Sequence, residues 1–497
     1  MSDFQRAISA VPSRHHSSAH VTDESYDRQL RDLLAYLRQP CLVPNTVDPK
    51  ETLESVSPAI HSLSFLYLLR AQIQQLQKRS KRDIPEEVLP GGVVWEHSVR
   101  FLRTFDPTQI KYAGHDWRQT VELLATAAQV ISKPILAVKV IRTALERVDT
   151  RGVFTSLHLA LVKFALLSSS YALALPIVDQ LLYQFPTETN HAHSEYPLCS
   201  EHGSNTVFLA DTSGFSTTLN YRDHLQFYLY SAMIYMALRK WDRASHCLSV
   251  IISAPTTNSV SKIMVEAYKK WILSNLLGHG KLISIPSIVA PHVIRIYQSL
   301  ARPYISLAEA FEKGDLQKLS AEIGIGHSIW RGDNNSGLVS QVLEAYDKFV
   351  VIKLGKTFSA LMMPDVLERA SSCSKGPLNI EEFVVSMVMS NELGTATISH
   401  ASSTENTAML RFSLRTQDHQ FREDHIRAGL LHRRRALNSI ARGIAQTDRS
   451  LELSQENIQS IVKHQKWSGN AENPGALGSG EAGGDGDMDE DLMGDVH

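Results

Sequence analysis

The chain is poor in cysteine and lacks a long apolar run. Its 497 residues include only four cysteines, at Cys41, Cys199, Cys247 and Cys373. None has the short spacing of a disulfide framework or a four-thiolate zinc site, so a reducing compartment is expected. An uncharged, apolar-leaning stretch, Phe164–Val178, has 15 residues and contains Pro176. That is fewer than the roughly 18 that a membrane-spanning helix needs.

The first residues also lack an apolar stretch of secretory length. Met1–Ala10 carries Asp3 and Arg6, so no signal peptide is expected. The basic run Lys78–Arg82 could act as a nuclear import signal, although the exposed end of a basic helix explains it equally simply. We therefore expect the protein in the cytoplasm and nucleus.

Positive charge is missing from one part of the chain. The formal net charge is -2, which does not favour general binding of polyanions. Gly376–Leu410 contains no lysine or arginine, and its only charges are the carboxylates Glu381, Glu382, Glu392 and Glu405. Cations at the phosphates supply most of the affinity of a DNA-binding module. This segment is therefore expected to bind protein.

Apolar residues recur at helical spacing through the first two thirds of the chain. Leu30, Leu33, Leu34 and Leu37 form one stripe, and similar stretches occupy residues 63–76, 121–130, 135–148 and 157–167. Alternation at strand period is scarce before residue 390. The pattern predicts an all-α, TPR-like helical-repeat solenoid over residues 26–335. Residues 1–25 are expected to lack fixed structure, and residues 184–220 to form a polar surface insertion.

One hairpin of the array can be placed in register. The pattern predicts helices at Leu225–Leu238 and Asp242–Ile252. Ala232 and Ala244 stand where two helices cross closely, and larger side chains flank them. This hairpin indicates helical-repeat packing but no ligand.

The last third of the chain predicts a small α+β module and a long helix. An amphipathic helix at 338–350 is followed by a short helix from Pro364 and by a buried stripe at 380–388. Two strands are expected at Thr395–Ser399 and Ala408–Ser413, which gives a winged-helix module over residues 336–415. Residues 418–466 predict one long helix, because apolar residues recur every seven positions at Leu430, Leu437, Ile444, Leu451 and Ile458. The glycine-rich, acidic residues 467–497 are expected to be disordered.

This layout resembles the PCI-domain family of scaffold subunits, found in the proteasome lid, the COP-9 signalosome and translation initiation factor three. Local matches are similar to the family of the signalosome's third subunit. They are Ala232–Tyr235, Ser261 with Met264, Glu266–Lys270, Asp333–Asn335 and Gly337–Val339. The resemblance covers roughly residues 221–412 and is faint before that. It does not extend to the insertion 184–220, the extended N-terminus or the acidic tail.

The resemblance implies a non-catalytic scaffold subunit of a complex that removes a ubiquitin-like modifier from cullins. In that family, PCI subunits join wing to wing and gather their C-terminal helices into one bundle. Partners would then be other PCI subunits and a metalloprotease-containing core. The implied wing contacts are Thr395, Thr397, Leu410 and Phe412, and the implied bundle contacts are Leu430, Leu437, Ile444, Leu451 and Ile458. Unpaired strand edges and lone heptad helices also attract partners on physical grounds, although both elements could instead pack within this chain.

Several enzyme-like motifs fail on spacing. His191, His193, Cys199 and His202 could close a zinc site, but their spacing is unusual, and a metalloprotease motif would lack its third zinc ligand. Gly355–Thr357 resembles a phosphate-binding loop with Val350 in place of the required glycine, and Glu490 stands where a calcium loop needs glycine. We expect no catalytic residue, no cofactor and no metal site.

Three alternatives remain open from the sequence. The chain could be a PCI subunit of the proteasome lid or of the initiation factor. It could be a winged-helix nucleic-acid-binding protein that uses Arg433–Arg435. A metalloenzyme is the third alternative.

Overall fold

A computed structural model describes the chain at residues 11–13, 22–38, 53–148, 150, 152–182, 185–186, 209, 213–256, 260–369, 377–389, 393, 396–400, 408–412, 419–452, 458–459 and 461–462. It divides into two compact units, residues 1–419 and 420–497. Residues 467–497 and most of 1–25 and 184–220 lie outside the described part. The predicted disorder of the tail, and the histidines and cysteine of the insertion for which no metal site is expected, therefore concern residues that the structure does not describe.

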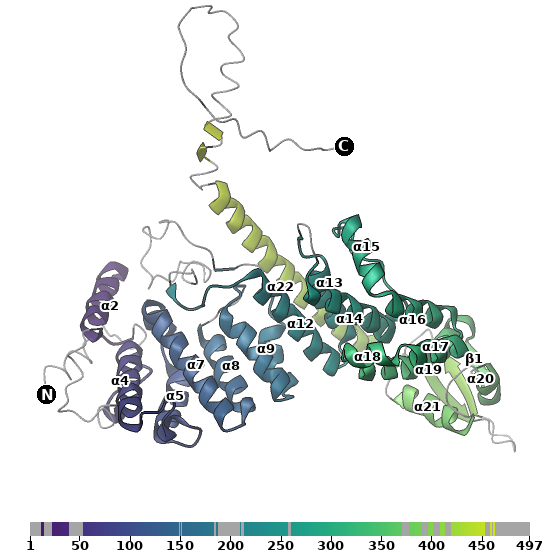
Figure 1. Cartoon of the computed structure of the whole chain (residues 1–497), viewed down its shortest axis with the longest axis horizontal. Coiled ribbons are helices and arrows are strands. Elements are labelled where there is room, and N and C mark those ends of the chain that lie inside the picture. The colour runs from purple at the N-terminus through teal and green to yellow at the C-terminus, as the bar shows by residue number, and fades with distance from the viewer. Residues whose placement is uncertain are drawn as a thin grey trace, which may run out of the picture. The chain divides into compact units, whose positions relative to one another are not determined.

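Helices that follow one another in the chain pack side by side through the first unit (Figure 1). The first half contains α2 (Asp23–Leu37), α4 (Ser62–Ser80), η2 (Glu86–Val88), α5 (Val93–Thr104), α6 (Pro107–Ile110), η3 (Lys111–Ala113), α7 (Gly114–Val130), α8 (Pro134–Val148), α9 (Ser156–Leu167) and α10 (Tyr171–Val178). The second half contains α12 (Tyr221–Ala237), α13 (Trp241–Ile252), α14 (Lys262–His279), α15 (Pro291–Leu300), α16 (Arg302–Lys313), α17 (Leu316–Ile325), α18 (His327–Gly332) and α19 (Ser336–Thr357). This order confirms the predicted helical repeats.

Local signals fix many helix ends. Ser261 and Asp315 accept backbone N–H groups in the first turns of α14 and α17. Gly280 ends α14 in the left-handed region, at φ 66°, and a β-carbon there would collide with the Phe349 ring. At these three helix ends, the residue type favours the backbone conformation that the helix end requires.

The α12–α13 hairpin follows its predicted register. Ala232 and Ala244 are wholly buried where the two helices cross, and Tyr235, Leu248 and Ile251 are buried around them. Trp241 lies against Gly278 of the next helix, since a β-carbon on that glycine would lie 2.6 Å from the Trp241 Cβ. Small residues therefore allow close packing both within this hairpin and with α14.

Two segments expected to be loose are docked on the array. Val11 and Ser13 are buried, and the Ser13 hydroxyl donates to Asp106 Oδ2 at 2.6 Å. At the end of the polar insertion, Phe215 is buried against Trp117, with ring centroids 5.4 Å apart. The prediction of no fixed structure for residues 1–25 is thus wrong at 11–13 and at 22–25, and Phe215 and Ser216 are buried within the segment predicted to be a surface loop. Apolar side chains within polar stretches explain both results.

A second, smaller core follows the array. It contains a three-stranded antiparallel sheet in the order β1 (Ala360–Met362), β3 (Ala408–Phe412), β2 (Ala396–His400), together with α20 (Met363–Arg369) and α21 (Pro377–Met389). Its buried members are Val351, Leu361, Met363, Val366, Val384, Met387, Ala396, Ala408 and Leu410. Helix α19 belongs to both cores, because Val339, Val342 and Tyr346 pack in the array and Val351 in the sheet module.

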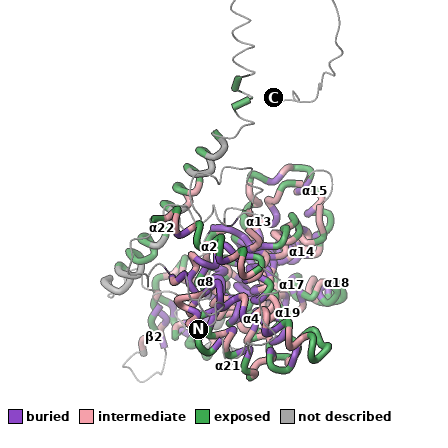
Figure 2. Tube along the Cα trace, turned by 90° about the vertical axis from the view of Figure 1, so that its left-hand side faces the viewer, coloured by how far each residue is buried: buried purple, intermediate pink, exposed green. Residues whose placement is uncertain are grey.

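The second unit contains one long helix, α22 (His419–Glu452). Its described residues are mostly exposed, whereas every helix of the repeat array contributes buried residues (Figure 2). In the part of the chain that the structure describes, no helix has the length and apolarity needed to cross a bilayer.

Candidate subunit-interaction sites

The predicted wing has a third strand, and this strand changes which edges are free. Ala360–Met362 pairs with β3 in the register Leu361 to Leu410, while β2 pairs with the other side of β3 in the register Ile398 to Leu410. Strand β3 is therefore central. Leu410 is wholly buried, and Phe412 packs on Gly355, whose added β-carbon would lie 2.7 Å from the ring. The prediction that Leu410 and Phe412 lie at a free edge is wrong.

The hydrogen-bond pattern identifies the groups that β2 presents outward. The Phe412 N–H donates to the Ser359 carbonyl at 2.8 Å, on the β1 side of β3. Backbone groups alternate in direction along an antiparallel strand. The backbone N–H and C=O of Arg411 therefore face β2, where Arg411 pairs with Thr397. The backbone N–H and C=O of Ile398 then face away from β3. The outer edge of β2 is thus formed by Ile398 and its alternate neighbours, whereas Thr397 is bonded inward with an exposed side chain. Thr395 lies outside the described residues.

The helix beside this sheet carries no cation. Helix α21 contains no lysine or arginine, and its Glu382 is exposed. Val384 and Met387 face the core, as the predicted stripe requires. The charge on this helix is therefore unfavourable for contact with phosphate.

Helix α22 carries the predicted heptad seam in an exposed state. Leu430 is 60% exposed and Leu437 is 66% exposed, and Ile444 is also exposed. Ile458, which follows the end of α22 in the chain, is exposed as well. The side chain of Leu451 lies outside the described residues. A narrow apolar seam on an otherwise polar helix is the surface that a helical bundle buries. The exposed apolar seam of α22 therefore fits association with other helices.

Residues that carried the family resemblance meet in a buried polar clamp. Lys269 and Lys270 of α14 lie opposite the turn between α18 and α19, which contains Asp333 and Asn335. Lys269 Nζ donates to Asp333 Oδ2 at 2.8 Å, and Lys270 Nζ donates to Asn335 Oδ1 at 2.8 Å. Tyr304 of α16 joins them, because its hydroxyl donates to Asp333 Oδ2 and accepts from Asn335 Nδ2, each at 2.8 Å.

Burial keeps the Tyr304 hydroxyl of this clamp protonated. Burial raises the pKa of the Tyr304 hydroxyl, so it stays protonated and can donate to Asp333. Lys270 is only 4% exposed and also pairs with Glu266 at 3.1 Å. Sequence comparison could find these residues, but only the structure shows that they join α14, α16 and the start of α19.

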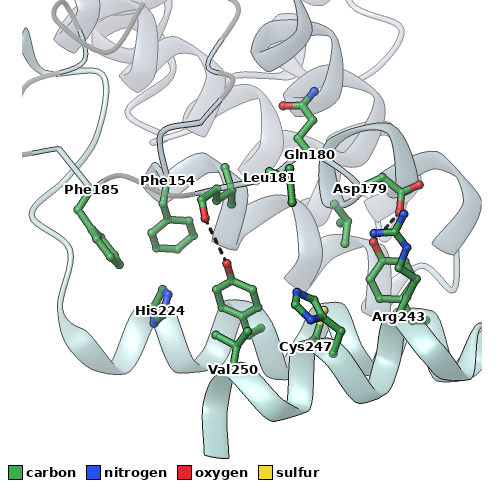
Figure 3. A pocket seen from close by; sticks show the side chains of 14 residues that line it. Phe154, Asp179, Gln180, Leu181, Phe185, His224, Arg243, Cys247 and Val250 are labelled. Carbon is green, nitrogen blue, oxygen red and sulfur yellow. Dashed lines mark hydrogen bonds between the residues drawn. The ribbon is translucent and has the colours of Figure 1, made fainter. Parts of the chain in front are cut away.

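A cleft of about 400 Å³ lies between α10 and the α12–α13 hairpin (Figure 3). One end is aromatic, with Phe154, Phe185, His224 and Tyr228. At the other end, the Tyr235 hydroxyl donates to Asp179 Oδ1 at 2.6 Å. No sequence motif predicted this cleft, because its lining residues come from separate segments of the chain.

The titratable groups of the cleft do not suit nucleophilic catalysis. Burial raises the pKa of the Cys247 thiol to about 12, so the reactive thiolate is scarce at neutral pH. Burial lowers the pKa of His224 and raises that of Tyr228 to about 12. Among the described residues, no three His, Cys, Asp or Glu side chains gather closely enough to hold a metal ion.

Comparison with known proteins agrees with the repeats and with the resemblance. Residues 27–294, just over half of the chain, match the family model described as COP9 signalosome complex subunit 3, N-terminal helical repeats. The chain is 63% identical over 495 residues to COP9 signalosome complex subunit 3 of Emericella nidulans, which covers 100% of both chains. It is 26% identical over 344 residues to the protein of the same name from Neurospora crassa, which covers 68% of this chain and 67% of that one. The chain belongs to the COP9 signalosome subunit 3 family.

Proposed function

We propose that this chain is a non-catalytic scaffold subunit of the COP9 signalosome and that it supports cullin deneddylation by assembly. The full-length likeness to subunit 3 carries this proposal. The buried thiol of Cys247 and the structural role of the lysine clamp agree with a subunit whose polar residues serve folding. The chain would work in the nucleus and cytoplasm.

Two surfaces would join it to neighbours. Residues 336–415 would form a PCI winged-helix module, in which the outer edge of β2 at Ile398 accepts a strand from another PCI subunit. The seam at Leu430, Leu437, Ile444, Leu451 and Ile458 would enter a bundle with helices of other subunits. Residues 26–335 would form the repeat array that precedes both surfaces in the chain.

Two other scaffold assignments predict the same fold with different partners. A proteasome-lid or initiation-factor subunit would also present a sheet edge and a C-terminal helix. The full-length likeness to signalosome subunit 3 favours the signalosome. For a nucleic-acid-binding protein, the absence of cations from α21 means that phosphate would have to be bound elsewhere, for example by the arginines of α22.

The test is mass spectrometry of the assembly recovered with a tagged, full-length chain at moderate salt. Recovery of stoichiometric signalosome subunits, including a separate metalloprotease, is the expected result. Recovery of proteasome-lid or initiation-factor subunits would leave the proposed fold unchanged but would assign the chain to a different complex. If no PCI-domain partner is recovered, the scaffold proposal fails.

A further inference from the structure

A row of arginines lies on α22 opposite its apolar seam. Arg435, Arg442 and Arg449 recur every seven residues, and all three are exposed. Each stands five positions after a seam residue, which places it about 140° around the helix axis. A bundle that buries the seam would therefore leave this arginine row facing solvent.

The helix that carries the row has an excess of positive charge. Helix α22 contains seven arginines against four carboxylates. The Arg442 Nε donates to the Asn438 carbonyl at 3.2 Å, which leaves its charge uncompensated. Within the described part of α22, no carboxylate forms an ion pair with Arg435, Arg442 or Arg449. The row is thus a cationic surface that an anionic partner could cover.

The chain itself contains an acidic segment of opposite charge. Its last cationic lysine or arginine is Lys466, and six carboxylates follow in one short stretch, at Asp485, Asp487, Asp489, Glu490, Asp491 and Asp495. We propose that this acidic tail, residues 485–495, docks on the arginine row of α22.

Reach and concentration favour the tail over a separate partner. The row is about 21 Å long, at 1.5 Å per residue. A connection of 35 residues separates Arg449 from Asp485, and at about 3.3 Å per extended residue it can span far more than that. Because the tail is tethered, its effective concentration at the row is on the order of millimolar, which a free acidic peptide would rarely match. The contact does not depend on the proposed function, since it uses the face that the bundle does not need.

Peptide binding to full-length chains tests the contact. Chains are immobilised at low density, and a peptide of residues 481–497 is passed over them. A tail-neutral chain, with the six carboxylates changed to the matching amides, should bind the peptide at least tenfold more tightly than the unchanged chain. In the unchanged chain, its own tail occupies the row.

The cationic side is tested in the tail-neutral chain. Adding Arg435→Gln, Arg442→Gln and Arg449→Gln should weaken peptide binding at least tenfold, and glutamine keeps a good helix propensity. The matched control carries Arg103→Gln, Lys139→Gln and Lys163→Gln, which removes the same charge from exposed positions of the repeat array. This control should bind the peptide as the tail-neutral chain does.

Salt and competition complete the test. Peptide binding should weaken steeply when sodium chloride rises from about 50 to about 300 mM, because exposed ion pairs are screened. Equal peptide binding by the unchanged and tail-neutral chains would overturn the proposal. An equal loss in the control would also overturn it, because the attraction would then come from overall charge. A DNA duplex that binds both chains equally well and displaces the peptide would assign the row to nucleic acid instead.

Discussion

At the scale of single residues, one polar cluster joins three parts of the array. In the clamp, Lys269, Lys270, Tyr304, Asp333 and Asn335 are linked by four side-chain hydrogen bonds. A buried lysine without an acceptor would be costly, so the two lysines and the turn at Asp333 depend on each other. Here a local sequence match reflects folding rather than a ligand.

Removing one member of the clamp should destabilise the array. Lys270→Met leaves the Asn335 amide oxygen without its donor, and we expect a loss of about 1–3 kcal/mol in the free energy of unfolding. Urea unfolding followed by circular dichroism would measure it. Lys262→Met is the matched control, since Lys262 is exposed on the same helix and its loss should cost less than about 0.5 kcal/mol. Equal effects of the two changes would contradict the clamp.

His158 should make stability depend on pH. It is wholly buried, and burial lowers its pKa to about 4, whereas an unfolded histidine has a pKa of about 6.5. The unfolded chain therefore binds the proton first, and stability is lost as pH falls from about 6.5 toward 4. At pH 5 the loss from this residue is about 2 kcal/mol.

The variant His158→Asn isolates this effect. Asparagine can still accept the Thr155 backbone N–H, which His158 Nδ1 accepts at 3.2 Å, but it does not titrate. Between pH 7 and pH 5, the unchanged chain should lose about 2 kcal/mol more than the variant. Parallel unfolding curves against pH would show that His158 is not the titrating group.

At the scale of elements, long periodic helices were predictable and short irregular segments were not. The heptad and repeat patterns predicted α4, α7, α8, α12 and α22, because each helix has a stripe of apolar residues that continues over several turns. Strand β1 has only three residues, too few to show alternation, and missing it placed β3 wrongly at an edge. The docking of Val11 and Phe215 depends on distant partners, which no local pattern records.

The edge of β2 gives a prediction of its own. Ile398→Pro removes an N–H that faces away from β3, so it should abolish pairing with a partner strand while the sheet persists. Loss of the neighbouring PCI subunit after purification, with unchanged circular dichroism, is the expected result. Thr397→Pro should instead disrupt the bond to Arg411 and destabilise the module. Normal recovery of partners with Ile398→Pro would rule out this edge as an interface.

At the scale of the whole molecule, folding and assembly use separate parts of the chain. The repeat array and the sheet module share α19, so neither core closes without that helix. The seam of α22 has the opposite character, because its leucines remain exposed. A chain that buries one set of apolar residues and exposes another in a regular row is stable only in part until partners cover the row.

The exposed seam should make the isolated chain self-associate. Replacing Leu430 and Leu437 together with glutamate should lower the sedimentation coefficient of the isolated chain at micromolar concentration, because the seam can no longer be buried between copies. The same change should release the chain from its complex while the repeats stay folded. The matched control is Ala428→Glu with Ala445→Glu, which adds the same charge at exposed positions away from the seam. If this control released the chain equally well, added charge rather than the loss of the seam would explain the effect, and α22 would have no role in the bundle.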